Sequence, residues 1–296
     1  MKRALVYCAL AYVAALIAAF AVGWLMAGSH PLWVAFVADV VATLVVFGFS
    51  VALDNSSMYD PYWSVAPVPI GVYFALQAEL TPRAILSLAL VTVWAVRLTY
   101  NFLRGWQGLA HEDWRYVSIR QKTGRAYWVV SLLGIHLFPT LMVFAGCLPL
   151  YAALAPGARP LQLLDLLACV VTALAIAIEA LADAQLRRFR LRSDRSPDEV
   201  MGEGLWARSR HPNYFGEMLF WWGLFLFALA ADPASAWTGV GALAITVMFH
   251  VVSLRLLETR MVERRPAYAE RVRQLPAFVP YGRLSKPELS LGRSEL

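Results

Sequence analysis

Long apolar runs, rather than alternating apolar and polar positions, dominate the chain. A helix needs roughly 20 apolar residues to cross a bilayer core about 30 Å thick. The runs therefore predict an all-α fold, a polytopic transmembrane helical bundle of about eight membrane helices. The predicted spans cover residues 4–27, 32–52, 63–79, 82–103, 127–153, 161–187, 213–231 and 235–257.

The third span contains Pro67 and Pro69, which membrane helices tolerate when neighbouring groups satisfy the freed backbone. An amphipathic stretch, 258–275, follows the last span. No internal repeat or low-complexity linker divides the chain. We therefore expect one integral-membrane domain over 1–281 and a flexible tail over 282–296.

Composition supports the membrane class, since 59% of the residues are hydrophobic and 16% are charged, against about 25% charged residues in soluble domains. The net charge is +6, but the arginines and lysines gather in three segments, 104–126, 187–210 and 260–273. By the positive-inside rule, these segments and both termini are cytoplasmic. Membrane lipids are thus expected partners and nucleic acid is not. The alanine-rich composition favours a bacterial inner membrane.

The three cysteines, Cys8, Cys147 and Cys169, all lie inside apolar segments and lack the spacing of metal ligands. No metal site or disulfide framework is expected.

The sixth span carries charged residues at helical spacing. Glu179, Asp183, Arg187 and Arg190 recur every three or four positions, so they share one face of a helix. Carboxylates at membrane depth usually face the bundle interior or a wet cavity. The alternative is an ion-pair ladder at the end of the helix.

A second polar cluster, 206–217, opens the seventh span. Arg210 and His211 stand beside the positive end of a helix, where a phosphate binds readily. Asn213 and Glu217 lie four apart and share one face, which suits a ligand amide or a ribose hydroxyl. Interfacial anchoring with one structural glutamate is the alternative.

Two cytoplasmic loops add aromatic and charged residues. The segment 111–116 includes Arg115 and is a stacking and ion-pairing site for a nucleotide or else a solvated loop. In the segment 54–64, Tyr59, Asp60 and Tyr62 supply hydrogen-bond donors and acceptors, although Asp60 could simply cap the third helix.

At the end of the last span, Arg255 and Glu258 lie three apart on a helix. The outer arginines that follow them could instead bind lipid headgroups. Soluble nucleotide-binding motifs such as GxGxxG and GxxxxGK[ST] are missing, as are HExxH and GxSxG. Any cofactor must therefore lie between the helices, at the cytoplasmic ends of the spans.

The string Ser209–Glu217 looks like the hallmark segment of the steroid 5α-reductase superfamily, and it is also similar to that of the sterol Δ14-reductases. The whole chain resembles the uncharacterised, DUF1295-like bacterial branch of that superfamily. Segments 60–64, 112–116 and 183–185 carry this likeness too, and the more specific motifs lie in the C-terminal half, 127–281.

This resemblance implies a cytosol-facing pocket in the helical bundle that binds NADPH. It also implies reduction of an enone-like C=C bond in a steroid, isoprenoid or other lipid substrate. The candidate catalytic residues, which would supply the proton, are Tyr62, Asp60 and Tyr59. The candidate cofactor-binding residues are Arg115, Glu179, Asp183, Arg187, Arg190, Trp206, Arg210, His211, Asn213, Tyr214, Glu217, Arg255 and Glu258.

The chain departs from the steroid enzymes in the third span. Those enzymes place an adjacent Gln-Glu pair beside the substrate ketone, where this chain has Val65-Ala66-Pro67. Gln77 and Glu79 lie at the predicted opposite end of that helix. The resemblance therefore does not extend to a Δ4-3-ketosteroid substrate or to the residue that donates the proton.

Two other classes share some of these features. Isoprenylcysteine carboxyl methyltransferases have the same Arg-His-Pro-x-Tyr-x-Gly core, present here as Arg210–Gly216, and they bind S-adenosylmethionine. The extra arginines after Asp183 favour a pyrophosphate and hence the reductase. A non-enzymatic transporter or lipid-binding scaffold would use the same intramembrane carboxylates, although transporters commonly show an internal repeat.

Overall fold

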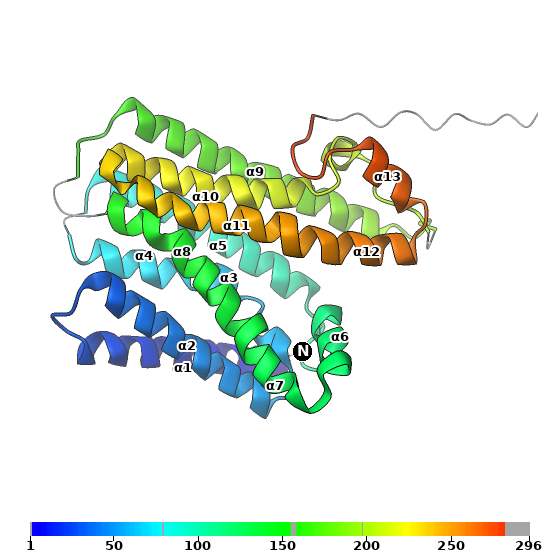
Figure 1. Ribbon diagram of the computed structural model, residues 1–296, viewed down its shortest axis with the longest axis horizontal. Helices are drawn as coiled ribbons and strands as arrows, with labels where there is room; N and C mark the ends of the chain where they lie inside the picture. Colours follow the sequence, from blue (N-terminus) through cyan, green and yellow to red (C-terminus); the bar gives the residue numbers. More distant parts are fainter. Residues whose placement is uncertain (1, 79, 155–157, 197, 282–296) are drawn as a thin grey trace, which may run out of the picture. The chain divides into compact units, whose positions relative to one another are not determined.

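The structure is a computed structural model that describes residues 2–78, 80–154, 158–196 and 198–281. Within these ranges the chain is helical and has no strand, so the predicted all-α class is confirmed (Figure 1). The predicted tail, 282–296, lies outside the described residues. The chain forms two compact units: unit 1 is Met1–Ala173 with Leu219–Thr246, and unit 2 is Leu174–Met218 with Val247–Leu296.

Most of the helices belong to unit 1. They are α1 (Lys2–Leu25), α2 (Pro31–Ala52), α3 (Tyr62–Val65), α4 (Pro67–Ala75), α5 (Pro82–Gly105), α6 (Trp114–Thr123), α7 (Tyr127–Val130) and α8 (Phe138–Ala153). Three helices contribute to both units, namely α9 (Leu163–Leu191), α10 (Pro212–Ala231) and α11 (Gly239–Met248), whereas α12 (Leu254–Arg264) and α13 (Tyr268–Gln274) belong to unit 2. Short 3₁₀ or π turns link them: η1 (Ser56–Tyr59), η2 (Gly124–Ala126), η3 (Ser131–Leu137), η4 (Gly204–Ala207), η5 (Pro233–Thr238) and η6 (Phe249–Ser253).

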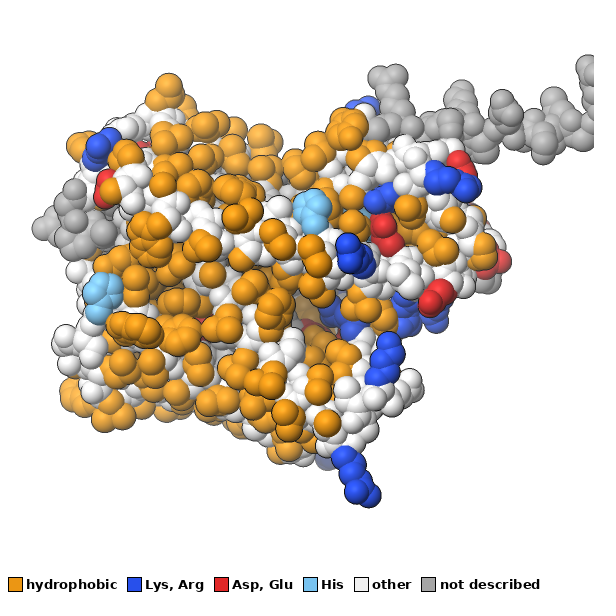
Figure 2. Space-filling view, in the orientation of Figure 1, with side chains coloured by type: hydrophobic (Ala, Val, Ile, Leu, Met, Phe, Trp, Pro, Cys, Tyr) orange, Lys and Arg blue, Asp and Glu red, His pale blue; other side chains and the backbone are white. Residues whose placement is uncertain are grey.

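In the described part of the chain, 7 helical segments are long and apolar enough to cross a membrane. They are Arg3–Leu25, Pro31–Ala52, Pro82–Gly105, Trp114–Ala153, Leu163–Leu191, Pro212–Ala231 and Pro233–Arg264. Large apolar side chains stand exposed on them, and Phe20 and Trp24 of α1 are 74% and 76% exposed. Figure 2 shows hydrophobic side chains over the visible faces of α1 and α2. Such a surface suits lipid rather than water, so the protein is an integral membrane protein.

The predicted third span, 63–79, is shorter than expected and is divided into α3 and α4. Pro67 lacks the N–H that would continue the hydrogen-bond ladder, and helical bonding resumes with the bond from Ile70 N–H to the Ala66 carbonyl. Helix α4 then ends at Ala75. The residues keep helical backbone angles across the break, because Ala66 has φ −59° and ψ −38°.

Helix α4 nevertheless reaches the end of unit 1 at which α2 begins. The ring of Phe74 packs on Tyr151, with centroids 5.4 Å apart, and Tyr151 packs in turn on His30, at 5.7 Å. His30 caps the start of α2. Because α2 rises about 33 Å over its length, α3 and α4 together run back along unit 1 from the far end of α2 to its start.

Unit 1 is fastened at that same end by a buried ion pair. Arg83 of α5 is 2% exposed and Asp165 of α9 is 3% exposed. Two guanidinium nitrogens donate to the two carboxylate oxygens at 2.6 and 2.9 Å, and Arg83 also donates to the Arg159 and Pro160 carbonyls. Because every one of these partners is fixed, the pair sets the position of α5 against the start of α9.

Candidate functional site

Helix α9 presents the predicted polar face in unit 2. The helix is unbroken to Leu191, so Glu179, Asp183, Arg187 and Arg190 follow one side of it, as the spacing predicted. Glu179 is 4% exposed. Asp183 and Arg187 are half-buried and Arg190 is exposed. The face therefore grades from a buried carboxylate to a solvated arginine.

The start of α10 packs directly on this face, because Gly216 has no side chain. A Cβ atom at Gly216 would lie 2.9 Å from the Ala175 carbonyl oxygen and 2.9 Å from the Glu179 nitrogen. The two helices are thus in backbone contact at this point. The neighbouring Glu217 is 4% exposed, so two acidic side chains are buried beside the contact.

Asn213 joins the two helices one turn earlier. Its amide nitrogen donates to Asp183 Oδ1 at 3.3 Å. Its Oδ1 is buried and accepts no hydrogen bond from the described part of the chain. A buried acceptor without a donor is costly, and a ligand N–H or hydroxyl would satisfy it.

Arg190 has both an acidic and two basic neighbours. Arg190 interacts electrostatically with Asp183 and also with Arg195 and Arg265. Arg195 comes from the loop after α9, and Arg265 follows α12. Neither was predicted as a site residue, because no spacing in the sequence joins them to Arg190. A cluster of like charges with one carboxylate is a setting that favours a polyanion.

Arg210 and His211, which the sequence suggested for phosphate, have partners within unit 2. Arg210 Nε lies 2.8 Å from Glu258 Oε1 and its Nη1 donates to the Val272 carbonyl at 2.6 Å. His211 Nε2 lies 3.0 Å from the same Glu258 oxygen. Burial lowers the pKa of His211 below its ordinary value, although the bond to Glu258 opposes this. These groups therefore hold the helix start to α12 and to the segment before residue 278.

The backbone of the same segment completes that attachment. The N–H groups of Arg210 and His211 donate to the Pro276 and Ala277 carbonyls at 3.1 and 2.9 Å, and the Ser209 hydroxyl donates to the Phe278 carbonyl at 2.6 Å. Glu258 pairs with Arg210 and His211, whereas Arg255, three positions before it, is exposed.

Trp206 and Tyr214 brace this part of unit 2. The Trp206 indole N–H donates to the Ala182 carbonyl of α9 at 2.9 Å, and Gln185 Oε1 accepts from the Leu205 N–H at 3.0 Å. The Tyr214 ring stacks on His211, with centroids 5.4 Å apart. Gln185 thereby docks η4 onto α9.

The candidate catalytic residues lie in unit 1, where Tyr59 and Tyr62 are buried and Asp60 is half-buried. Tyr59 and Tyr62 are 3% and 4% exposed, and their rings stack with centroids 5.0 Å apart. The Tyr59 hydroxyl lies 2.7 Å from Thr140 Oγ1. Burial raises the pKa of the Tyr59 phenol, so this hydroxyl stays protonated and can act as a donor.

Asp60 does not cap the third helix. Helix α3 begins after Pro61, which gives no side-chain cap, and Asp60 Oδ1 accepts from the Tyr116 hydroxyl at 2.5 Å. Burial raises the pKa of Asp60 to about 6, while Arg115 and the Tyr116 hydrogen bond pull it down. Arg115 itself pairs with Asp113 at 2.8 Å.

A residue that the sequence did not flag completes this group. The Tyr62 hydroxyl donates to Asp39 Oδ1 of α2 at 2.7 Å. Asp39 is 4% exposed and lies in the middle of an apolar span. The signal that could have found it is the rarity of a carboxylate at that depth, because its partner lies 23 positions away.

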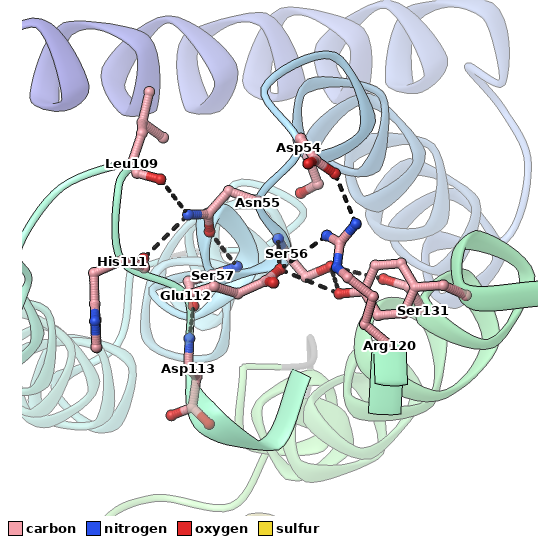
Figure 3. A network of polar contacts seen from close by, with 12 residues as sticks. Asp54, Asn55, Ser56, Ser57, Leu109, His111, Glu112, Asp113, Arg120 and Ser131 are labelled. Atoms are coloured by element: carbon pink, nitrogen blue, oxygen red, sulfur yellow. Dashed lines mark hydrogen bonds and ion pairs between the residues drawn. The ribbon is translucent and has the colours of Figure 1, made fainter. Parts of the chain in front are cut away.

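The loop before α3 is held in place by a dense polar network (Figure 3). Glu112 Oε1 accepts from the Ser56 N–H at 2.7 Å and from the Tyr127 hydroxyl at 3.2 Å. Arg120 bridges Glu112 and Asp54. Segment 111–116, for which the sequence left a nucleotide site and a solvated loop as alternatives, is thus anchored to residues 54–57, and this fixes the chain immediately before Tyr59.

The fold and this arrangement of polar residues define a polytopic, all-helical membrane protein with buried acidic and hydroxyl groups. The chain belongs to the DUF1295 family, described as a protein of unknown function, whose model matches residues 46–274. The expected likeness to DUF1295 proteins is confirmed. An uncharacterised protein of the fission yeast Schizosaccharomyces pombe is 28% identical over 279 residues, which is 85% of this chain and 80% of the yeast protein. No solved structure matches the chain.

Proposed function

We propose that this protein is a membrane-embedded reductase that uses NADPH to reduce an activated, enone-like C=C bond in a lipid substrate of the steroid or isoprenoid type. The observation that carries the proposal is the packed face of α9 and α10. There Gly216 brings two helices into backbone contact beside buried Glu179 and Glu217, and Asn213 keeps a buried acceptor for a ligand donor.

The residues of unit 2 fit NADPH chemically. Arg190, Arg195 and Arg265 would neutralise the pyrophosphate and the 2′-phosphate, because guanidinium groups bind phosphate oxygens in pairs. Asn213 and Asp183 would hold the ribose and carboxamide end through hydrogen bonds. When bound, NADPH supplies a hydride to the substrate.

The candidate donors of the proton that such a reduction consumes are Tyr59 and Tyr62. Both hydroxyls are buried and hydrogen-bonded, Tyr59 to Thr140 and Tyr62 to Asp39. A hydroxyl in a site from which water is excluded can polarise a carbonyl or protonate a carbon. Residues 54–57 hold the backbone that carries these phenols, so substitutions in the Figure 3 network would disturb their position.

We further propose that the protein resides in a bacterial inner membrane with both termini in the cytoplasm. The basic residues of loop 104–126 and of the segment after α9 support this orientation. It would place the arginine cluster on the side where NADPH is made available.

The first test is a thermal-shift titration of the detergent-purified protein with NADPH, NADH and S-adenosylmethionine. NADPH should stabilise the protein by mass action. Arg190→Ala should raise its Kd about tenfold, which corresponds to about 1.4 kcal/mol. The matched control, Arg188→Ala, removes an exposed arginine of the same helix and should leave the Kd unchanged.

Stabilisation by S-adenosylmethionine alone would overturn the reductase in favour of methyl transfer. Stabilisation by none of the three would leave the non-enzymatic alternatives. If NADPH binds, its oxidation in the presence of enone lipids tests the reaction. A Tyr62→Phe variant that binds NADPH but does not oxidise it would support Tyr62 as the proton donor.

A further inference from the structure

Helix α2 carries Asp39 as its single charged residue. Asp39 is 4% exposed and precedes the residues that match the family model. A carboxylate at this depth is expensive to keep charged, and residues of this kind in membrane helices usually have a function. The hydrogen-bond donors around Asp39 show whether the protein accommodates the neutral acid or the charged carboxylate.

Asp39 has few hydrogen-bond donors. Oδ1 is 2.7 Å from the Tyr62 hydroxyl, and Oδ2 is buried and has no hydrogen-bond partner in the described part of the chain. The titratable groups that interact electrostatically with Asp39 include Tyr59, Tyr62 and Cys147. None of these three is a cation, so none compensates a negative charge.

Asp165 gives the contrast within the same unit. It is buried to a similar degree, at 3% exposed, yet it receives two bonds from Arg83 and a third from the Gln162 N–H at 2.8 Å. That set of donors suits a carboxylate. The one hydroxyl beside Asp39 suits a neutral acid.

A chain of hydroxyls extends from Tyr62 to Tyr59. Thr43 hydrogen-bonds to Tyr62, Thr43 Oγ1 lies 2.7 Å from Thr140 Oγ1, and Thr140 Oγ1 lies 2.7 Å from the Tyr59 hydroxyl. Thr140 Oγ1 also donates to the His136 carbonyl at 2.9 Å, so within the chain it accepts. Asp39 is the acid at one end of this buried chain.

We propose that Asp39 is a proton store: it is held as the neutral acid in the resting protein, and it restores the proton of Tyr62. This inference rests on the proposed function for the use of that proton. With the proton on Oδ1, the 2.7 Å contact is donated by Asp39 and the Tyr62 hydrogen is free to leave.

The Tyr62 O–H bond breaks and its proton passes to the substrate carbon, while the electron pair stays on the Tyr62 oxygen. The Asp39 O–H bond then breaks, its proton forms a new bond to the Tyr62 oxygen, and Asp39 is left as a carboxylate. A proton from solvent regenerates the acid before the next turnover. Asp39 acts through Tyr62 and is thus a positioning residue.

Infrared difference spectroscopy of the full-length protein in lipid nanodiscs at neutral pH tests the proposal without substrate or cofactor. The spectrum of the wild type minus that of Asp39→Asn should contain the C=O stretch of a protonated carboxylic acid. The matched control, Asp165→Asn, should remove carboxylate bands instead. A difference spectrum of Asp39→Asn that shows carboxylate bands alone would overturn the proposal.

A second variant covers the case in which Asp39→Asn does not fold. Tyr62→Phe keeps the acid but removes its hydrogen-bond partner, so the acid band should persist and move to higher frequency. An unmoved band would show that another residue produces it. Because the band is measured without NADPH, a failure to bind NADPH would refute the proposed function and leave this result standing.

Discussion

At the scale of single residues, Asp60 shows what burial does to a carboxyl group. Its pKa is raised from 3.8 to about 6, chiefly by burial. The folded protein therefore holds a proton that the unfolded chain releases, and stability falls as the pH rises from 3.8 to about 6. Above that window the loss is constant.

Asp60→Asn should remove this pH dependence. The amide oxygen can still accept from the Tyr116 hydroxyl, so the variant keeps the contact and loses the titration. The melting temperature of the wild type should decrease from pH 3.8 to about 6 more steeply than that of the variant. Asp198→Asn, at an exposed position, serves as the control and should follow the wild type. If the melting temperatures of Asp60→Asn and the wild type change with pH in parallel, Asp60 is not the group that titrates in this window.

The sequence predicted single residues unevenly. Glu179, Asp183 and Asn213 were found because helical spacing and short motifs connect them along the chain. Asp39 was missed, although it is a lone carboxylate within an apolar span, and its pairing with Tyr62 is visible only in the folded structure. For the same reason the sequence could not show that Arg210 and His211 are held by Glu258, which lies 47 positions from His211.

At the scale of helices, the close approach of α9 and α10 depends on one missing side chain. In Gly216→Ala, the new Cβ would lie 2.8 Å from Glu179 Cβ and 2.9 Å from two backbone atoms, so one helix must shift. We expect a loss of about 1–3 kcal/mol, typical of overpacking, and weaker NADPH stabilisation.

Thermal melts with and without NADPH measure both effects. Gly48→Ala is the matched control: it also lies within an apolar helix, but a Cβ there meets nothing within 4 Å, so its melting temperature should stay level or rise slightly. If Gly216→Ala and Gly48→Ala change the melting temperature equally, the close contact of α9 with α10 does not contribute to stability.

The boundaries of the helices were predicted where apolar runs end at polar loops. The π turns η3 and η6 were not predicted, because a π turn changes the hydrogen-bond register without changing the apolar pattern. The π turn η3 places His136 at the buried face, where its Nε2 is 3.1 Å from Ser50 Oγ.

At the scale of the whole molecule, the buried ion pair of Arg83 and Asp165 links distant helices of unit 1. Arg83→Met would leave Asp165 as a buried charge without its partner, which typically costs about 3–5 kcal/mol. The double variant with Asp165→Leu should recover most of that loss. Melting temperatures of the two single variants and the double variant measure the coupling, and additive losses would contradict it.

The last question is how many times the chain crosses the membrane. Seven segments qualify by length and composition, and three of them precede loop 104–126. Three crossings would put the basic residues of this loop on the side of the membrane opposite to the N-terminal Lys2 and Arg3, against the positive-inside rule. The packing of Phe74 near Tyr151 and His30 indicates that α3 and α4 together return along unit 1. We therefore predict eight crossings, one of them made by this short pair.

Single cysteines on either side of α5 decide between the two topologies. Leu80 is 64% exposed before α5, and Lys122 is exposed in the loop after it. In intact cells, a membrane-impermeant maleimide should label Leu80→Cys, whereas Lys122→Cys should react only after the membrane is opened. The wild type, whose cysteines lie in apolar helices, measures the background. If α3 and α4 do not cross, the labelling pattern reverses: Lys122→Cys reacts from outside and Leu80→Cys is protected. The arginine-rich loop 104–126 would then face away from the cytoplasm, and the orientation proposed for the NADPH site would be wrong.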